Sequence, residues 1–138
     1  MPEAKTSGAY LYIAERSRDD AKVLLGQADK KHCAGAFYLG GYGAECALKA
    51  LLLHRSTTAQ RPKVLKWFYG KQGHDLDAIT KKLRERGVAI PRHLTRAFAN
   101  VNRWSVSLRY DTSDRTGHET AIFVQHVEQI ITWVKEAV

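Results

Sequence analysis

The sequence predicts an all-α fold, an antiparallel up-and-down helical bundle of four main helices plus a shorter extra helix. Two observations lead to it. Apolar residues recur at helical spacing over several long segments, and no segment alternates apolar and polar residues between hairpin turns as strands do. With 138 residues, of which 44% are hydrophobic and 26% charged, the chain is expected to form one domain, residues 1–138, with a substantial core.

The first two helices are expected over residues 7–30 and 34–55, with Ser7 as the N-cap of the first. The second is apolar on most of its circumference and carries four glycines: Gly35, Gly40, Gly41 and Gly43. Each glycine costs about 1 kcal/mol relative to alanine inside a helix. We therefore expect close approach there, with a neighbouring helix or a bulky aromatic side chain packed against the backbone. The spacing fits neither common glycine-rich phosphate-binding motif.

Residues 56–73 contain one proline, two glycines and no sustained period, so they are expected to form a long connection. A third helix then begins with Asp75 as its N-cap and ends at Gly87. Pro91 is expected to open a fourth helix as a first-turn proline.

A second irregular stretch, residues 105–117, leads into a last amphipathic helix over residues 118–137. It supplies four candidate catalytic residues: Arg109, Tyr110, Arg115 and His118. Histidine can transfer a proton during RNA cleavage without a metal, while arginine stabilises the charge that develops on the phosphate. The alternative is structural: His118 caps the last helix and Arg109 pairs with an acid.

Positive charge is concentrated in one block of the chain. The net charge is +8, and residues 61–109 hold 12 Lys or Arg against three acidic residues, a balance of +9. The remainder holds 10 basic and 11 acidic residues, a balance of −1. This asymmetry indicates an anionic partner, RNA or a nucleotide, although a solvated basic face without a partner is the alternative. Six candidate binding residues lie in the block: Lys81, Lys82, Arg84, Arg92, Arg96 and Arg103.

Glu45 and Lys49 are four residues apart in the second helix, in the favourable order for a helical ion pair. Their neighbours are apolar, so at least one of the two is expected to be partly buried and to need the other. Two interpretations remain open. The pair is either structural or part of a polar site in a groove of the bundle, where Lys49 meets an RNA or nucleotide phosphate.

Cys33 and Cys46 are 13 positions apart, which on one helix is roughly 20 Å, too far for a disulfide. Reduced thiols agree with a cytoplasmic protein. No metal is expected, because no Cys-x-x-Cys or His-Glu-x-x-His motif occurs. No other cofactor is expected either. Neither a membrane span nor a signal peptide is expected, since no apolar run is long enough and the first residues lack a basic start.

Several of these segments, taken in order, resemble the HEPN domain family. They are AGAFYLGGYGAECALKALLL, then GHDL at residues 73–76, then Trp104 and Arg109-Tyr110 before the last amphipathic helix. The resemblance covers nearly the whole chain. It implies a helical bundle that often dimerises. Many such domains are metal-independent endoribonucleases of toxin–antitoxin, abortive-infection or CRISPR systems, and others bind RNA or nucleotides or are encoded beside a minimal nucleotidyltransferase.

Ribonuclease members of the family carry Arg followed, after four to six residues, by His near the start of the last long helix. Here Arg109 and His118 have eight residues between them, and Arg115 and His118 have two. Arg86 and His93 have six, but they precede the fourth helix. The catalytic motif is thus not intact at the expected place.

Three functions follow from the residues and the resemblance together. The first is a homodimeric HEPN-type protein that binds RNA or a nucleotide within a prokaryotic toxin–antitoxin or defence pair, with a nucleotidyltransferase or antitoxin as partner. The second is an active endoribonuclease, in which His118 moves the proton and Arg109 or Arg115 stabilises charge, with Tyr110 and Glu45 in support. The third is a non-catalytic module for dimerisation or antitoxin binding.

Overall fold

The computed structural model describes residues 3–104 and 115–138, and these form helices and connections with no strand among them. The all-α prediction is confirmed. The described elements are α1 (Ser7–Leu25), α2 (His32–His54), α3 (Arg61–Phe68), η1 (Lys71–His74), α4 (Leu76–Glu85), η2 (Arg92–Leu94), α5 (Thr95–Val101) and α6 (Gly117–Ala137). The predicted count of five helices is wrong, because the described residues contain six α-helices and the two 3-10 helices η1 and η2.

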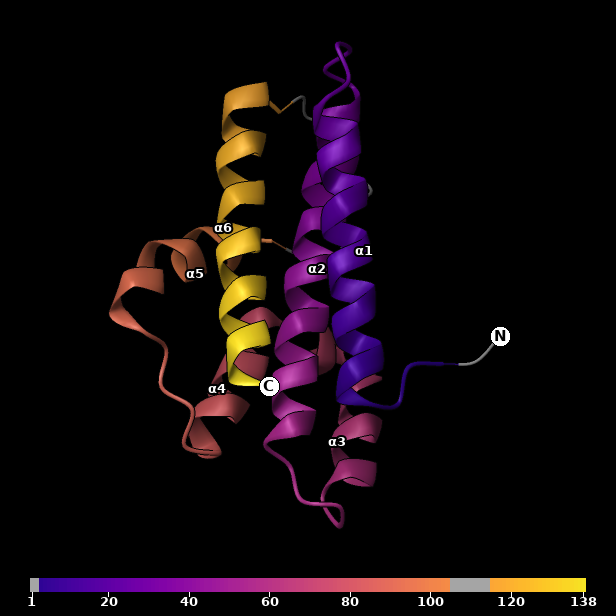
Figure 1. The fold of residues 1–138 in the computed structure, drawn as a ribbon, viewed down its shortest axis with the longest axis vertical. Coiled ribbons are helices and arrows are strands. Elements are labelled where there is room, and N and C mark those ends of the chain that lie inside the picture. Colours follow the sequence, from indigo (N-terminus) through magenta and orange to yellow (C-terminus); the bar gives the residue numbers. More distant parts are fainter. Residues whose placement is uncertain (1–2, 105–114) are drawn as a thin grey trace.

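Helix α2 is the central element, with α1 and α6 beside it along much of its length (Figure 1). Sixteen of its 23 residues are buried, which explains why it is apolar on most of its circumference. Helices α3, α4 and α5 also pack against this core, into which they bury Phe68, Ile79 and Phe98 respectively.

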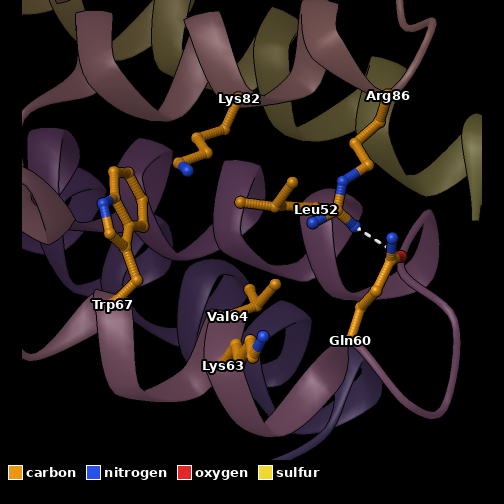
Figure 2. A pocket seen from close by; sticks show the side chains of 7 residues that line it. All are labelled: Leu52, Gln60, Lys63, Val64, Trp67, Lys82 and Arg86. Carbon is orange, nitrogen blue, oxygen red and sulfur yellow. Dashed lines mark hydrogen bonds between the residues drawn. The ribbon is translucent and has the colours of Figure 1, made fainter.

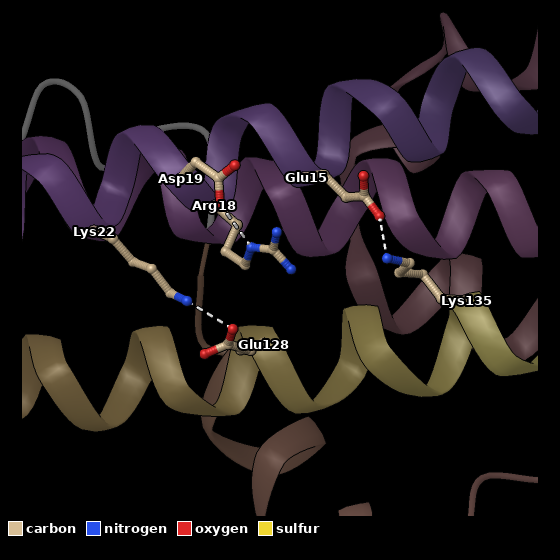
Figure 3. A network of polar contacts seen from close by, with 6 residues as sticks. All are labelled: Glu15, Arg18, Asp19, Lys22, Glu128 and Lys135. Carbon is tan, nitrogen blue, oxygen red and sulfur yellow. Dashed lines mark hydrogen bonds and ion pairs between the residues drawn. The ribbon is translucent and has the colours of Figure 1, made fainter.

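Helices α1 and α6 run in opposite directions and are linked by two ion pairs on the surface (Figure 3). Lys22 Nζ lies 2.6 Å from Glu128 Oε1, and Lys135 Nζ lies 2.9 Å from Glu15 Oε1. The order of the pairs shows the opposite directions, because residue numbers rise from Glu15 to Lys22 along α1 while those of their partners fall from Lys135 to Glu128 along α6. Exposed pairs of this kind contribute about 0–1 kcal/mol each, so apolar packing supplies most of the stability.

The glycines of α2 allow close packing, as the sequence predicts. A Cβ added at Gly40 would lie 3.3 Å from the Phe123 ring of α6, and one at Gly43 would lie 3.1 Å from a backbone oxygen of α1. A Cβ at Gly41 would lie only 2.1 Å from the Trp104 side chain, which is 3% exposed. These glycines therefore let an aromatic side chain and a neighbouring backbone approach the helix more closely than any other residue would.

The beginning and end of α1 differ from the prediction. Thr6 is its N-cap rather than Ser7, and the Thr6 hydroxyl accepts the hydrogen bond of a backbone N–H in the first turn. The Ser7 hydroxyl instead donates to the Ala50 carbonyl of α2 at 2.8 Å, tying the two helices together. Helix α1 ends at Leu25, five residues before the predicted end, because Gly26 and the polar residues after it form a turn.

The predicted long connection after α2 is wrong in part, because it contains α3 and η1. Pro62 occupies the first turn of α3, where a missing N–H costs nothing. The Thr57 and Gln60 side chains accept hydrogen bonds from each other's backbone N–H groups just before the helix. Val64 and Phe68 then anchor it in the core. Eight residues are too few for a helical period to be recognised in the sequence.

Among the described residues of the second half, the main difference from the prediction is at Pro91, and residues 105–114 of the predicted irregular stretch lie outside the described residues. Asp75 caps α4 by accepting two backbone N–H groups, and Gly87 beyond its end has a positive φ of 81°. Pro91 has extended backbone before η2, and α5 begins only at Thr95, so it is not the first-turn residue of an α-helix. Helix α6 begins one residue before the predicted start, capped by the Thr116 hydroxyl.

Candidate functional site

Glu45 and Lys49 are the charged residues that the described part of the chain buries. Lys49 Nζ donates to Glu45 Oε2 at 2.8 Å, and the two side chains are 6% and 1% exposed. The Lys49 ammonium also lies 5.0 Å from the centre of the Phe68 ring, within cation–π range. In such surroundings each charge depends on the other, because an unpaired buried charge is strongly destabilising.

His74 is a third member of this cluster and is missing from the sequence prediction. Its Nδ1 lies 3.3 Å from Glu45 Oε2, although the imidazole is half exposed. Gly73 places it there: a Cβ at Gly73 would lie 2.1 Å from the Phe68 carbonyl oxygen, so only glycine fits between η1 and α3. The segments AECALK and GHDL therefore meet at Glu45. The presence of histidine inside GHDL was the signal that could have identified it.

Three proton-bearing groups lie close to the buried pair. Burial raises the pKa of the Cys46 thiol from 9.0 to about 12, and the nearby Glu45 charge adds to the effect. Burial likewise raises the pKa of Tyr10 from 10.0 to about 12, and it raises that of Tyr42, which interacts with Cys46. Both cysteines, Cys33 and Cys46, are buried free thiols.

These raised pKa values predict loss of stability in alkali. Below about pH 9 the groups are protonated in both the folded and unfolded chain, and their contribution is fully present. As the pH rises from about 9 to about 12, the unfolded chain loses protons that the fold retains, so the free energy of unfolding falls. Cys46 alone contributes up to about 1.4 kcal/mol per pH unit. Urea midpoints across this range should fall less steeply in Cys46→Ala than in Cys33→Ala, and a flat profile in the unmodified protein would contradict the prediction.

The basic block lacks the ion pairs that α1 and α6 form. Within the described part of the block, no Lys or Arg between Arg61 and Arg103 lies within ion-pair distance of a described carboxylate. The six candidates do not gather on one face. Lys81 and Arg92 are exposed, Lys82 lines one pocket and Arg84 another, and Arg96 and Arg103 line a hollow beside α6.

The pocket that Lys82 lines lies between α2, α3 and α4 and has a volume of about 450 Å³ (Figure 2). Seven residues line it: Leu52, Gln60, Lys63, Val64, Trp67, Lys82 and Arg86. Lys82 and Trp67 stand at one end and Arg86 and Gln60 at the other, with Leu52 and Val64 between them. The lining contains three cations and no carboxylate, which makes it suited to an anion.

A second basic hollow, between α5 and α6, brings together residues that chemistry on RNA can use. Arg96 and Arg103 line it with His126 and Glu119 of α6. The Asn100 amide lies 2.8 Å from His126 Nδ1, and burial lowers the pKa of that imidazole, which favours its neutral form. His126 was missed in the sequence, where an isolated histidine inside an amphipathic helix carries no pattern.

The catalytic candidates at the start of α6 are only partly described. Arg109 and Tyr110 lie outside the described residues. His118 is exposed in the first turn of α6, while the Arg115 guanidinium lies 3.4 Å from Glu119 and 4.3 Å from the centre of the Phe37 ring of α2. Phe37 precedes Glu45 by eight residues, or about 12 Å along the helix. The structure therefore separates Arg115 from the Glu45–Lys49 pair.

Among the residues described, no three His, Cys, Asp or Glu side chains gather as metal ligands would. No described helix combines the length and apolarity needed to cross a bilayer. Comparisons with models of protein families, with curated proteins and with solved structures find no match for this chain.

Proposed function

We propose that this protein is a HEPN-type helical protein that binds RNA or a nucleotide in the cytoplasm. In this proposal it is a homodimer and one component of a prokaryotic toxin–antitoxin or defence system, with an antitoxin or nucleotidyltransferase as partner. Its helices would form an antiparallel up-and-down bundle in which α4 and α5 together take the place of one long helix. The phosphate contacts come from the candidate cations of α4 and of the segment around α5.

The observation that carries the proposal is that no described Lys or Arg between Arg61 and Arg103 lies within ion-pair distance of a described carboxylate. Lys22 and Lys135, outside the block, are paired with carboxylates. The phosphates of RNA or of a nucleotide would supply negative charge to the cations of the block, and their binding would release counterions condensed on the RNA.

RNA binding should weaken steeply with salt, and Arg96→Gln/Arg103→Gln should reduce that dependence. Losing two phosphate contacts on a single strand lowers the slope of log K against log salt by about 1.4. We expect an affinity loss of about tenfold, or about 1.4 kcal/mol, in gel-shift titrations. Lys22→Gln/Lys135→Gln removes the same net charge from α1 and α6 and should leave the slope unchanged. Equal losses in both double variants, or no binding of RNA or nucleotide at low salt, would refute the proposal.

A second candidate function is metal-independent RNA cleavage, favoured by the hollow that brings Arg96, Arg103 and His126 together. His118 and Arg115 at the start of α6 provide further groups of the same chemistry, with Arg109 and Tyr110 as the other candidates. Cleavage by the pure protein in EDTA that is lost in His118→Ala would establish the predicted assignment, and cleavage lost only in His126→Ala would move the site to the hollow. A tight complex with a neighbouring gene product and no affinity for nucleic acid would instead favour the non-catalytic module.

A further inference from the structure

The pocket between α2, α3 and α4 is a candidate binding site that the sequence did not indicate. Its volume of about 450 Å³ falls within the roughly 300–1,000 Å³ of typical small-molecule sites. Lys63, Lys82 and Arg86 reach it from α3 and α4, and no lining residue is acidic. An occupant with negative charge is therefore favoured over a neutral or cationic one.

The guanidinium of Arg86 is oriented by hydrogen bonds to two neighbouring side chains. One terminal nitrogen, Nη1, donates to the Ser56 hydroxyl and, at 3.0 Å, to Gln60 Oε1. Ser56 is itself 4% exposed and donates to the Leu52 carbonyl, so the guanidinium is oriented by a buried group. The N–H groups on Nε and Nη2 have no described protein acceptor. These two nitrogens present the fork of donors that binds phosphate in a bidentate manner.

The other end of the pocket offers a flat aromatic surface. Trp67 is fixed by a hydrogen bond from its indole N–H to Gln72 Oε1, at 3.3 Å. The Lys82 ammonium lies 5.2 Å from the centre of the indole ring. Leu52 and Val64 line the space between this end and Arg86. A bare inorganic anion would use the cations and leave the aromatic and aliphatic surface without a partner.

We propose that this pocket binds a nucleoside phosphate, the unit that free nucleotides and RNA share. Arg86 and Lys63 hold the phosphate, and the base packs against Trp67, beside the Lys82 ammonium, and against the neighbouring aliphatic side chains. Base–aromatic packing tolerates any base, so the site selects a phosphate joined to a planar ring. The inference rests on the proposed function and adds to it the site at which one nucleotide is held.

The first test is a titration of the full chain with adenosine monophosphate, followed by tryptophan fluorescence. We expect saturable quenching that disappears in Trp67→Phe, since phenylalanine keeps an aromatic surface but removes the reporter. Calorimetry should show that Trp67→Phe still binds. Inorganic phosphate should bind at least tenfold more weakly than the nucleotide, because it cannot use the aromatic surface. Equal affinities for the two would overturn the assignment of the base.

Matched variants then locate the site. Arg86 and Arg55 are both arginines that follow the last residue of a helix, but only Arg86 lines the pocket. Lys63 and Lys66 are both exposed on α3, and only Lys63 lines the pocket. We expect Arg86→Gln to weaken nucleotide binding about tenfold or more and Lys63→Gln several-fold. Arg55→Gln and Lys66→Gln should change it less than twofold, with unfolding curves checking that each variant is folded.

A short single-stranded RNA separates this inference from the proposed function. If RNA binds but the nucleotide neither quenches Trp67 nor responds to Arg86→Gln and Lys63→Gln, the pocket assignment is wrong and the proposed function stands. If neither ligand binds at low salt, both are wrong. If RNA binds more tightly than the monophosphate and Arg86→Gln weakens both, the pocket is the place where one nucleotide of the RNA is held. If only the monophosphate binds, the site serves free nucleotides.

Discussion

Lys49→Met is expected to lower the free energy of unfolding by about 3–5 kcal/mol, the cost of leaving a buried carboxylate without its cation. Glu45 is 1% exposed, and its second oxygen already has no hydrogen-bond partner among the described residues. Within the part of the chain that the structure describes, His74, half exposed and 3.3 Å away, is the ion-pair partner of Glu45 that would remain, and it is positive only when protonated. Urea unfolding followed by far-ultraviolet circular dichroism would give the difference.

The matched control is Lys135→Met, because Lys135 forms a pair of nearly the same length with Glu15 at the surface. The two nitrogen–oxygen distances are 2.8 and 2.9 Å, so burial is the main difference between the pairs. The surface variant should lose at most about 1 kcal/mol. Glu45→Leu/Lys49→Met should recover most of the loss, since removing both charges leaves nothing unpaired. Similar small losses in both single variants would show that Glu45 is solvated in solution.

This result would also decide between the two interpretations of the pair that the sequence left open. If Lys49 contacts a phosphate, its substitution should mainly weaken binding of RNA or nucleotide and should lower the free energy of unfolding only modestly. The side chain is 6% exposed and is directed at Glu45 and the Phe68 ring, which favours the structural interpretation. Measuring nucleotide affinity of the folded Glu45→Leu/Lys49→Met variant would test it, with unchanged affinity as the expected outcome.

The fold could be predicted where apolar spacing or a local cap determines it. Helices α1, α2, α4 and α6 are long enough to show a period, and Asp75 and Gly87 mark the ends of α4 by their own chemistry. Helix α3 could not be predicted in this way. Its eight residues show no period, and what stabilises it is the burial of Val64 and Phe68 against helices distant in sequence.

The candidate sites were predictable to the extent that charge composition determines them. The excess of positive charge is visible in the sequence, but its division among three surfaces depends on how α3, α4 and α5 pack. Arg86 illustrates the limit: the sequence places it at a helix end, whereas its orientation comes from Ser56 and Gln60, 30 and 26 residues away. Trp67 lines the same pocket because it lies on α3, a helix that the sequence did not predict.

Gly41→Ala is expected to destabilise the protein by about 2–4 kcal/mol, although alanine is the better helix former by about 1 kcal/mol. The added methyl would lie 2.1 Å from Trp104, a side chain that is 3% exposed and cannot remain in place. Displacing it forfeits part of the burial of a tryptophan, which is worth about 3–5 kcal/mol. The expected signs are a lower urea midpoint and a red shift of tryptophan emission.

Gly8→Ala is the control, because Gly8 lies in the first turn of α1 with nothing within 4 Å of the added methyl. There alanine should stabilise the protein by up to about 1 kcal/mol. If Gly41→Ala lowers the free energy of unfolding while Gly8→Ala raises it, then the close packing of Trp104 against α2, and not helix propensity, explains the glycine at position 41. If Gly41→Ala proved as stabilising as Gly8→Ala, Trp104 could not pack against α2. The contact with Trp104 is therefore the physical reason for a glycine at position 41 of α2.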